Sequence, residues 1–185
     1  MSGQREKRDW RDALIASYPG LFKVTESGRT GTPGYPTVGD GWRELVETAV
    51  ARIAKAVDAA RPGSAKIVQI KEKFGGLRLY WQGWQLGAAT NDAIDEAVAL
   101  AEARAACTCE TCGEEGRLHD KHGWLSTACD LHAQGDPVTV QPGFENVRLV
   151  WTIETGKILV VSRRRYVRAT DSFIDLDPKS IDIEE

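Results

Sequence analysis

Three cysteines and one histidine have the types and spacing of a metal site. Cys109 and Cys112 form a Cys-x2-Cys pair, and after sixteen intervening residues Cys129 and His132 form a Cys-x2-His pair. Thiolate and imidazole are preferred ligands of Zn²⁺, and each short pair can span one edge of a tetrahedron. A closed set of four leaves no coordination position for water or substrate. We therefore predict a structural Zn²⁺ held by these four side chains.

The residues between the two pairs predict how the ligands are presented. Gly113 follows Cys112 and allows a tight knuckle with positive φ. Residues 124–128 have the composition of a short strand that leads into Cys129, from which a helix can start with two ligands on one face. A knuckle, a hairpin and a ligand-bearing helix are together typical of treble-clef zinc fingers. We expect such a finger over residues 107–135.

Two neighbouring groups leave alternatives open. Cys107 lies two residues before the first ligand, so it could replace His132 in an all-cysteine site or lie buried as a small apolar residue. All four cysteines fall between 107 and 129, and in a reducing compartment this clustering favours metal binding over disulfides. His119 and His122, with Asp120, resemble the hairpin histidines of ββα-metal (HNH-type) nucleases. However, His132 is already used by the zinc site, so no further histidine is left to join His119 and His122 in binding a second metal ion. We therefore prefer to interpret them as exposed turn residues.

The composition predicts a soluble cytoplasmic protein. The chain has 185 residues, 42% hydrophobic and 28% charged, and its mean hydropathy is −0.35. It contains no run of roughly 18 apolar residues, the length that a membrane span needs. Its net charge of −3 and pI of about 5.7 speak against general binding to nucleic acid.

Positive charge is nevertheless concentrated at two places. Lys71, Lys73 and Arg78 surround the pair Gly75-Gly76, and they indicate either a phosphate-facing surface or a hairpin turn with solvated lysines. The second group lies on a predicted strand and comprises Arg163, Arg164 and Arg165. It can grip phosphates, or it can protect an edge strand from aggregation, which we prefer. A nucleic-acid-binding site that uses both groups requires all six side chains to converge on one face.

Hydrophobic periodicity predicts an α+β fold of helices and a β-hairpin, with an inserted treble-clef-like finger and a C-terminal β-hairpin. Helices are expected over 5–17, from 42 to a stop near Arg61-Pro62-Gly63, and over 90–106, with Asp40 as the N-cap of the second. Strands are expected over 67–71 and 77–81, over 147–152 and 157–162, and in an edge strand after 171. In 77–81, either Leu77, Leu79 and Trp81 share the apolar side, or a bulge brings Tyr80 there. The regions are then an α+β core (1–106), the finger (107–135), and a C-terminal hairpin with an acidic tail (136–185) that packs on the core.

Four sequence motifs together resemble an uncharacterised family of small proteins encoded by phages and prophages. They are Gly39-Asp40-Gly41-Trp42, the segment 71–78 (KEKFGGLR), Cys109-Glu110-x-Cys112-Gly113, and Gly123-Trp124-Leu125-x-Thr127-x-Cys129-x-x-His132. The likeness covers roughly residues 18–133. The resemblance implies an accessory protein of a mobile element, such as an inhibitor of a host defence system or a regulator, and it carries over no catalytic residue.

The sequence therefore favours a non-enzymatic, zinc-stabilised protein-interaction module. A nucleic-acid-binding protein that uses the two basic groups is the first alternative. An HNH-like metal-dependent nuclease is the second, since Asp120 with His119 or His122 is the best acid–base set available.

Overall fold

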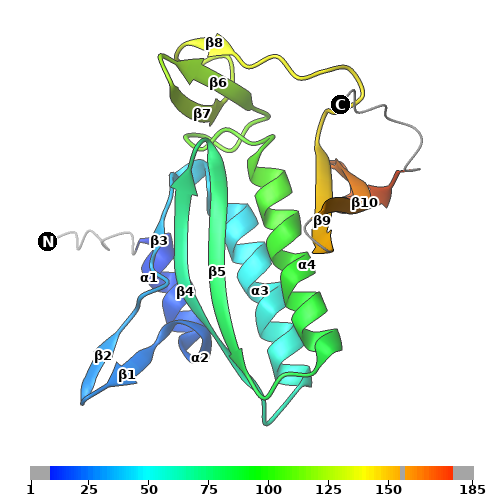
Figure 1. Ribbon diagram of the computed structural model, residues 1–185. Coiled ribbons are helices and arrows are strands. Elements are labelled where there is room, and N and C mark those ends of the chain that lie inside the picture. The colour runs from blue at the N-terminus through cyan, green and yellow to red at the C-terminus, as the bar shows by residue number, and fades with distance from the viewer. Residues whose placement is uncertain (1–8, 155–156, 177–185) are drawn as a thin grey trace, which may run out of the picture.

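The computed structural model describes residues 9–154 and 157–176 and has a mixed α+β architecture (Figure 1). The helices are α1 (Trp10–Ser17), α2 (Pro19–Phe22), α3 (Arg43–Ala59) and α4 (Ala88–Ala105), with a 3-10 turn η1 (Asp40–Trp42) before α3. The strands of the core are β1 (Val24–Glu26), β2 (Arg29–Gly31), β3 (Pro36–Thr37), β4 (Ser64–Lys73) and β5 (Gly76–Trp84). The later strands are β6 (Arg117–Lys121), β7 (Trp124–Ala128), β8 (Asp136–Pro137), β9 (Val147–Glu154), β10 (Lys157–Val167) and β11 (Ser172–Asp175). In these ranges no helix is long and apolar enough to cross a membrane.

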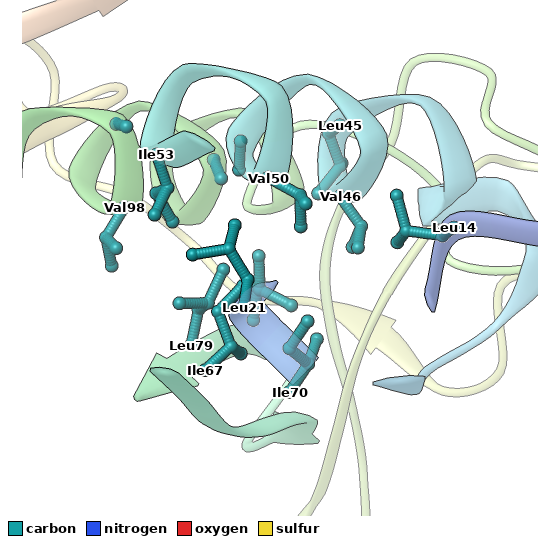
Figure 2. Packing of buried hydrophobic residues seen from close by; sticks show 14 of the residues in the cluster. Leu14, Leu21, Leu45, Val46, Val50, Ile53, Ile67, Ile70, Leu79 and Val98 are labelled. Atoms are coloured by element: carbon teal, nitrogen blue, oxygen red, sulfur yellow. The ribbon is translucent and has the colours of Figure 1, made fainter. Parts of the chain in front are cut away.

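The main core lies between a three-stranded sheet and two long helices. The sheet has the order β3-β4-β5, and α3 and α4 cover one of its faces (Figure 1). Apolar side chains three and four residues apart on α3, such as Val46, Val50 and Ile53, point toward Ile67 and Ile70 of β4 (Figure 2). The small residues of α4 allow it to pack closely against α3. The predicted helices from 42 to near Arg61 and over 90–106 are confirmed within two residues.

The β4–β5 hairpin is confirmed, and its register settles which side chains face the core. Phe74 and Gly75 both have positive φ (56° and 74°), which is the pattern of a two-residue type I′ turn. A bulge at Val68 lies in β4 and not in β5. Consequently Leu77, Leu79 and Trp81 point to the helices, whereas Tyr80 is 45% exposed on the opposite face.

The role predicted for Asp40 is wrong. The N-cap residue of α3 is Trp42, which ends η1, and no side chain caps this helix. Asp40 instead accepts a hydrogen bond of 2.9 Å from Nε1 of Trp10 and lies 3.0 Å from the guanidinium of Arg11. These contacts tie α1 to the segment before α3, and they lower the pKa of Asp40. The carboxylate of Asp40 therefore binds Trp10 and Arg11 of α1, although the local sequence pattern predicts that it caps α3.

The C-terminal hairpin forms a separate three-stranded sheet with the order β11-β10-β9. The predicted strands 147–152 and 157–162 are confirmed, and residues 155–156 of their turn lie outside the described residues. Because β10 is the central strand, the interpretation of Arg163, Arg164 and Arg165 as protection of an edge strand is wrong. Strand order depends on tertiary pairing and not on the local pattern.

Ion pairs and one buried tyrosine attach this sheet to the helices. The guanidinium of Arg164 binds both carboxylate oxygens of Glu96 on α4, at 2.6 and 2.7 Å. Tyr166 is 2% exposed against Leu100, and burial is the main cause that raises its pKa to about 12. Its hydroxyl donates to Asp171 at 2.7 Å. The sheet is thus held mostly by directional polar contacts around a small apolar cluster.

Replacing Glu96 with Gln should lower the free energy of unfolding by about 1 kcal/mol, because a two-bond ion pair on α4 is lost. Its hydrogen bond with Arg164 lowers the pKa of Glu96 below the usual 4.5. The carboxylate therefore stabilises the fold above pH 4.5, and this contribution is lost as the pH falls through the lower, folded-state pKa. Urea unfolding across this pH range should show that the difference in unfolding free energy between wild type and E96Q becomes smaller on acidification.

The control E47Q removes only the exposed i,i+4 pair with Arg43 and should lower the free energy of unfolding by a few tenths of a kcal/mol. An equal loss in both variants contradicts the prediction.

Candidate metal centre

The four predicted ligand residues lie together. Their donor atoms are all within 4.8 Å of one another, so the group could hold a metal ion. Sγ of Cys112 and Sγ of Cys129 are 3.7 Å apart, and Nδ1 of His132 lies 3.7 Å from Sγ of Cys109 and 3.2 Å from Sγ of Cys129. Tetrahedral zinc with ordinary bond lengths separates two sulfurs by about 3.8 Å and a sulfur from a nitrogen by about 3.5 Å. The donor set and its dimensions therefore fit a zinc ion.

Two turns present these ligands. The first is the knuckle, residues 109–113, in which the amide of Gly113 donates to the carbonyl of Cys109 at 2.9 Å and Gly113 has φ +84°. The second follows β7: the amides of His132 and Ala133 donate to the carbonyl of Cys129 at 3.0 and 2.8 Å. The helix predicted from Cys129 is wrong, because this single turn does not continue. Gly135, with φ +82°, instead leads the chain into β8, which pairs with β6.

The electrostatics of the cluster favour a bound cation. Burial acts to raise the pKa of the Cys109 thiol, but hydrogen bonds from the amides of Cys129, Cys112 and Thr111 outweigh it and lower the pKa to about 6. For Cys112, the amide of Glu114 lowers the pKa, but burial and the neighbouring thiols together raise it. Sulfurs this close cannot all ionise without a compensating positive charge. A divalent cation at their centre would supply that charge.

Cys107 lies outside the cluster. It is 6% exposed, and its thiol donates to the carbonyl of Arg104 at 3.3 Å. It packs with Leu100 and Tyr166, and burial raises its pKa. The sequence left open whether Cys107 is a ligand or a small buried residue. In the structure it is a small buried residue between α4 and the C-terminal sheet.

The knuckle docks onto the segment 39–42, which contains the Gly-Asp-Gly-Trp motif. The amide of Gly39 donates to the Glu110 side chain and the amide of Gly41 donates to the Glu110 carbonyl, each at 2.8 Å. Nε1 of Trp42, which is fully buried, donates to the carbonyl of Thr108 at 2.8 Å. A Cβ added at Gly41 would lie 2.3 Å from the carbonyl oxygen of Cys109 and 2.4 Å from the amide nitrogen of Gly113. The motif is therefore a docking surface for the knuckle.

The β4–β5 turn supports the finger from a second side. Oγ1 of Thr127 on β7 donates to the carbonyl of Gly75 at 2.6 Å. A Cβ added at Gly75 would lie 2.4 Å from Cδ1 of Leu118. The absence of a side chain at Gly75 therefore allows the finger of the same chain to approach this turn closely. Sequence reasoning missed the supporting roles of Trp42, Glu110 and Thr127, although the Gly-Asp-Gly-Trp motif contained a signal for the first.

The histidines of the finger hairpin differ from each other. His122 is exposed in the turn between β6 and β7, as expected. His119 is 2% exposed, so the interpretation of it as an exposed turn residue is wrong. Its Nδ1 lies 2.9 Å from the carbonyl of Arg117, and since a carbonyl only accepts, Nδ1 donates. Asp120 accepts from the amide of Gly123 at 2.6 Å and so stabilises the turn. Over residues 9–154 and 157–176, no second cluster of metal ligands accompanies them.

The six basic residues are divided between two sheets. Lys71 and Arg78 are directly opposite each other on β4 and β5, and Lys73 is at the end of β4. On β10, Arg164 is bound to Glu96 and Arg165 donates to the carbonyl of Gly143 at 2.7 Å. Arg163 lies on the same strand, opposite Leu149 of β9. Helix α4 contacts both β5 and β10 and lies between the two sheets (Figure 1).

In comparisons with known proteins, no family model, curated protein or solved structure matches this chain. The phage-protein resemblance therefore stays an expectation based on four motifs. Two of these motifs, at 109–113 and 123–132, contain the four candidate ligands. The other two, at 39–42 and 71–78, contact the finger.

Replacing Gly41 with Ala should push the knuckle away from the segment 39–42 and lower the free energy of unfolding by about 1–3 kcal/mol, as overpacking does. The clash is with backbone atoms, which cannot move aside as a flexible side chain would. Thermal unfolding and the rate of metal loss to a chelator measure the effect. Gly31→Ala is the matched control, since nothing lies within 4 Å of its added Cβ. Equal behaviour of G41A and G31A would show that the docking contact does not matter.

Proposed function

We propose that Cys109, Cys112, Cys129 and His132 hold a structural Zn²⁺ and that the protein is a non-enzymatic interaction module built around it. The observation that supports the metal is the group of four donors with the mutual distances of a tetrahedral site. Three thiols and one imidazole suit zinc better than magnesium or calcium, which prefer oxygen ligands. A filled set of four protein ligands holds the fold and leaves no open coordination position.

Zinc binding would contribute directly to folding of the finger. The knuckle and the turn after β7 consist mostly of irregular backbone, and few apolar side chains of this region are buried. Structural zinc binds small peptides with about 10–16 kcal/mol of apparent free energy, enough to order such a segment. Because the knuckle contacts the segment 39–42 and β7 contacts the β4–β5 turn, the metal also fixes these two parts of the core.

The finger exposes two large apolar side chains that are available to a protein partner. Trp124 is 75% exposed and Leu131 is 91% exposed. Exposed aromatic and large aliphatic side chains are enriched where proteins contact each other. These two side chains support the protein-interaction role. As part of the same proposal, the protein is a cytoplasmic accessory protein of a mobile element, for example an inhibitor of host defence or a regulator. The nuclease alternative has little support, because His132 belongs to the four-donor cluster and Nδ1 of the buried His119 is bound to a carbonyl.

Replacing Cys112 with Ser should leave three ligands and unfold at least residues 107–133. Purified wild type should contain about one equivalent of zinc, while the variant should contain far less and show a lower thermal midpoint. Metal analysis by mass spectrometry together with circular dichroism measures both. Cys107→Ala is the control, because this cysteine lies outside the cluster and should leave the zinc content unchanged. Wild type with less than about half an equivalent of zinc contradicts the proposal.

Replacing both Trp124 and Leu131 with Ala should abolish capture of a protein partner without changing zinc content, since both side chains are exposed. Affinity capture from host cells with quantitative mass spectrometry compares wild type, this double variant and Ile174→Ala. Ile174 is 56% exposed on β11 and serves as the matched control. A species retained by wild type and the control but lost by the double variant is expected. Equal recovery by all three proteins, or no enrichment by any, contradicts this surface.

A further inference from the structure

The β4–β5 hairpin has a second face that is turned away from α3 and α4 (Figure 1). Cross-strand pairing places alternate residues of the two strands on this outer face. We call it the basic face, and its members are Ser64, Lys66, Gln69, Lys71 and Lys73 of β4 with Gly76, Arg78, Tyr80, Gln82 and Trp84 of β5. None of the ten is acidic, although the whole protein has a net charge of −3. Positive charge is therefore concentrated here against the overall balance.

Two aromatic rings lie open on the basic face. Tyr80 is 45% and Trp84 is 49% exposed, whereas the intervening Trp81 points to the helices and donates from Nε1 to Asp95 at 3.1 Å. Nζ of Lys71 lies 5.9 Å from the centre of the Tyr80 ring. The face thus alternates stacking surfaces with cationic groups along about 25 Å of strand.

Three of the four basic side chains are not committed to an acidic partner. Nζ of Lys66 donates to the carbonyls of Gly20 and Lys23 at 2.6 and 2.8 Å, so it serves the fold. In the described part of the chain, the salt bridges of the core involve arginines other than Arg78, and none involves Lys71 or Lys73. Nη1 of Arg78 donates to the carbonyl of Leu77 at 2.7 Å, which leaves its charge without a carboxylate partner. The charges of these three groups are therefore available to neutralise phosphates.

We propose that the basic face binds single-stranded nucleic acid, a function beyond the protein contact proposed for the finger. A single strand offers phosphates to Lys71, Lys73 and Arg78 and unstacked bases to the exposed rings of Tyr80 and Trp84. Exposed rings between cationic groups on an open sheet are the arrangement that sequence-tolerant single-strand binding requires. The contact of the finger with Gly75 holds the end of the hairpin in place, so the proposal rests on the same zinc-supported fold.

The rings are what favour a single strand over a duplex or an acidic protein. Bases in a duplex are already stacked on their neighbours, so flat rings on a sheet face gain nothing from it. A duplex is also wide enough to approach the acidic remainder of this protein, whereas one strand can stay on the narrow basic face. An acidic peptide would match the charge but would leave the rings without flat partners.

The test measures fluorescence anisotropy of a labelled oligo-dT of about 20 nucleotides, of the corresponding oligo-rU, and of a duplex of equal length. Wild type should bind at least one single strand in about 50 mM salt, more tightly than the duplex. Three phosphate contacts predict a slope of log K against log salt of about −2. The triple variant K71Q/K73Q/R78Q should flatten that slope to near zero, while Lys55→Gln, an exposed lysine on α3, should leave it unchanged.

The aromatic variants separate stacking from charge. Tyr80→Leu should weaken binding of the single strand by about tenfold, and Tyr80→Phe, which keeps the ring, should bind like wild type. Zinc content and thermal midpoint of each variant distinguish loss of this surface from loss of the zinc-supported fold. Equal affinity for duplex and single strand, unchanged binding by Y80L, or no binding by zinc-loaded wild type would each overturn the proposal. Binding of poly-glutamate by wild type, without binding of oligo-dT or oligo-rU, would assign the face to an acidic protein instead.

Discussion

The approach of the knuckle backbone to Gly41 is the constraint on which the rest of the structure depends. At this point two backbones lie closer than any side chain allows, and hydrogen bonds from Gly39, Gly41 and Trp42 fix their alignment. The β6–β7 hairpin brings Cys129 and His132 to the cysteines of the knuckle, and Thr127 of β7 also contacts Gly75 in the β4–β5 turn. The four-donor cluster, the segment 39–42 and the hairpin turn are therefore one structural unit. This unit explains together motifs that lie far apart in the sequence, such as Gly39 and Glu110, which are 71 residues apart.

Local spacing predicted the features that local physics determines. The Cys-x2-Cys and Cys-x2-His pairs indicated which side chains gather, because ligand spacing is a short-range geometric requirement. Periodicity located the two long helices and both hairpins. The errors arose where a distant residue decides the outcome. Asp40 has a good capping sequence, but Trp10, thirty residues earlier, takes its carboxylate. The position of β10 at the centre of its sheet depends on β11, and no pattern within 157–167 contains that information.

The β4–β5 hairpin performs three different tasks with one alternating sequence. Its inner residues, such as Ile70 and Leu79, build the core, and its turn receives Thr127 of the finger. Its outer residues are left polar, cationic and aromatic. Period-two alternation makes this division possible, because each strand residue faces only one side. The bulge at Val68 keeps both faces in register across a long twisted hairpin.

The two basic groups that look equivalent in the sequence have different roles because of what surrounds them. Arg164 lies 4.3 Å from the ring centre of Phe173 and binds Glu96, so its charge is neutralised inside an intramolecular contact. Lys71 has an aromatic neighbour too, but no carboxylate shares its face. A cation whose charge is already matched gains little from a phosphate, whereas an unmatched one releases counterions when it binds. For this protein, the local pairing of each charge is therefore a better guide to ligand binding than its net charge of −3.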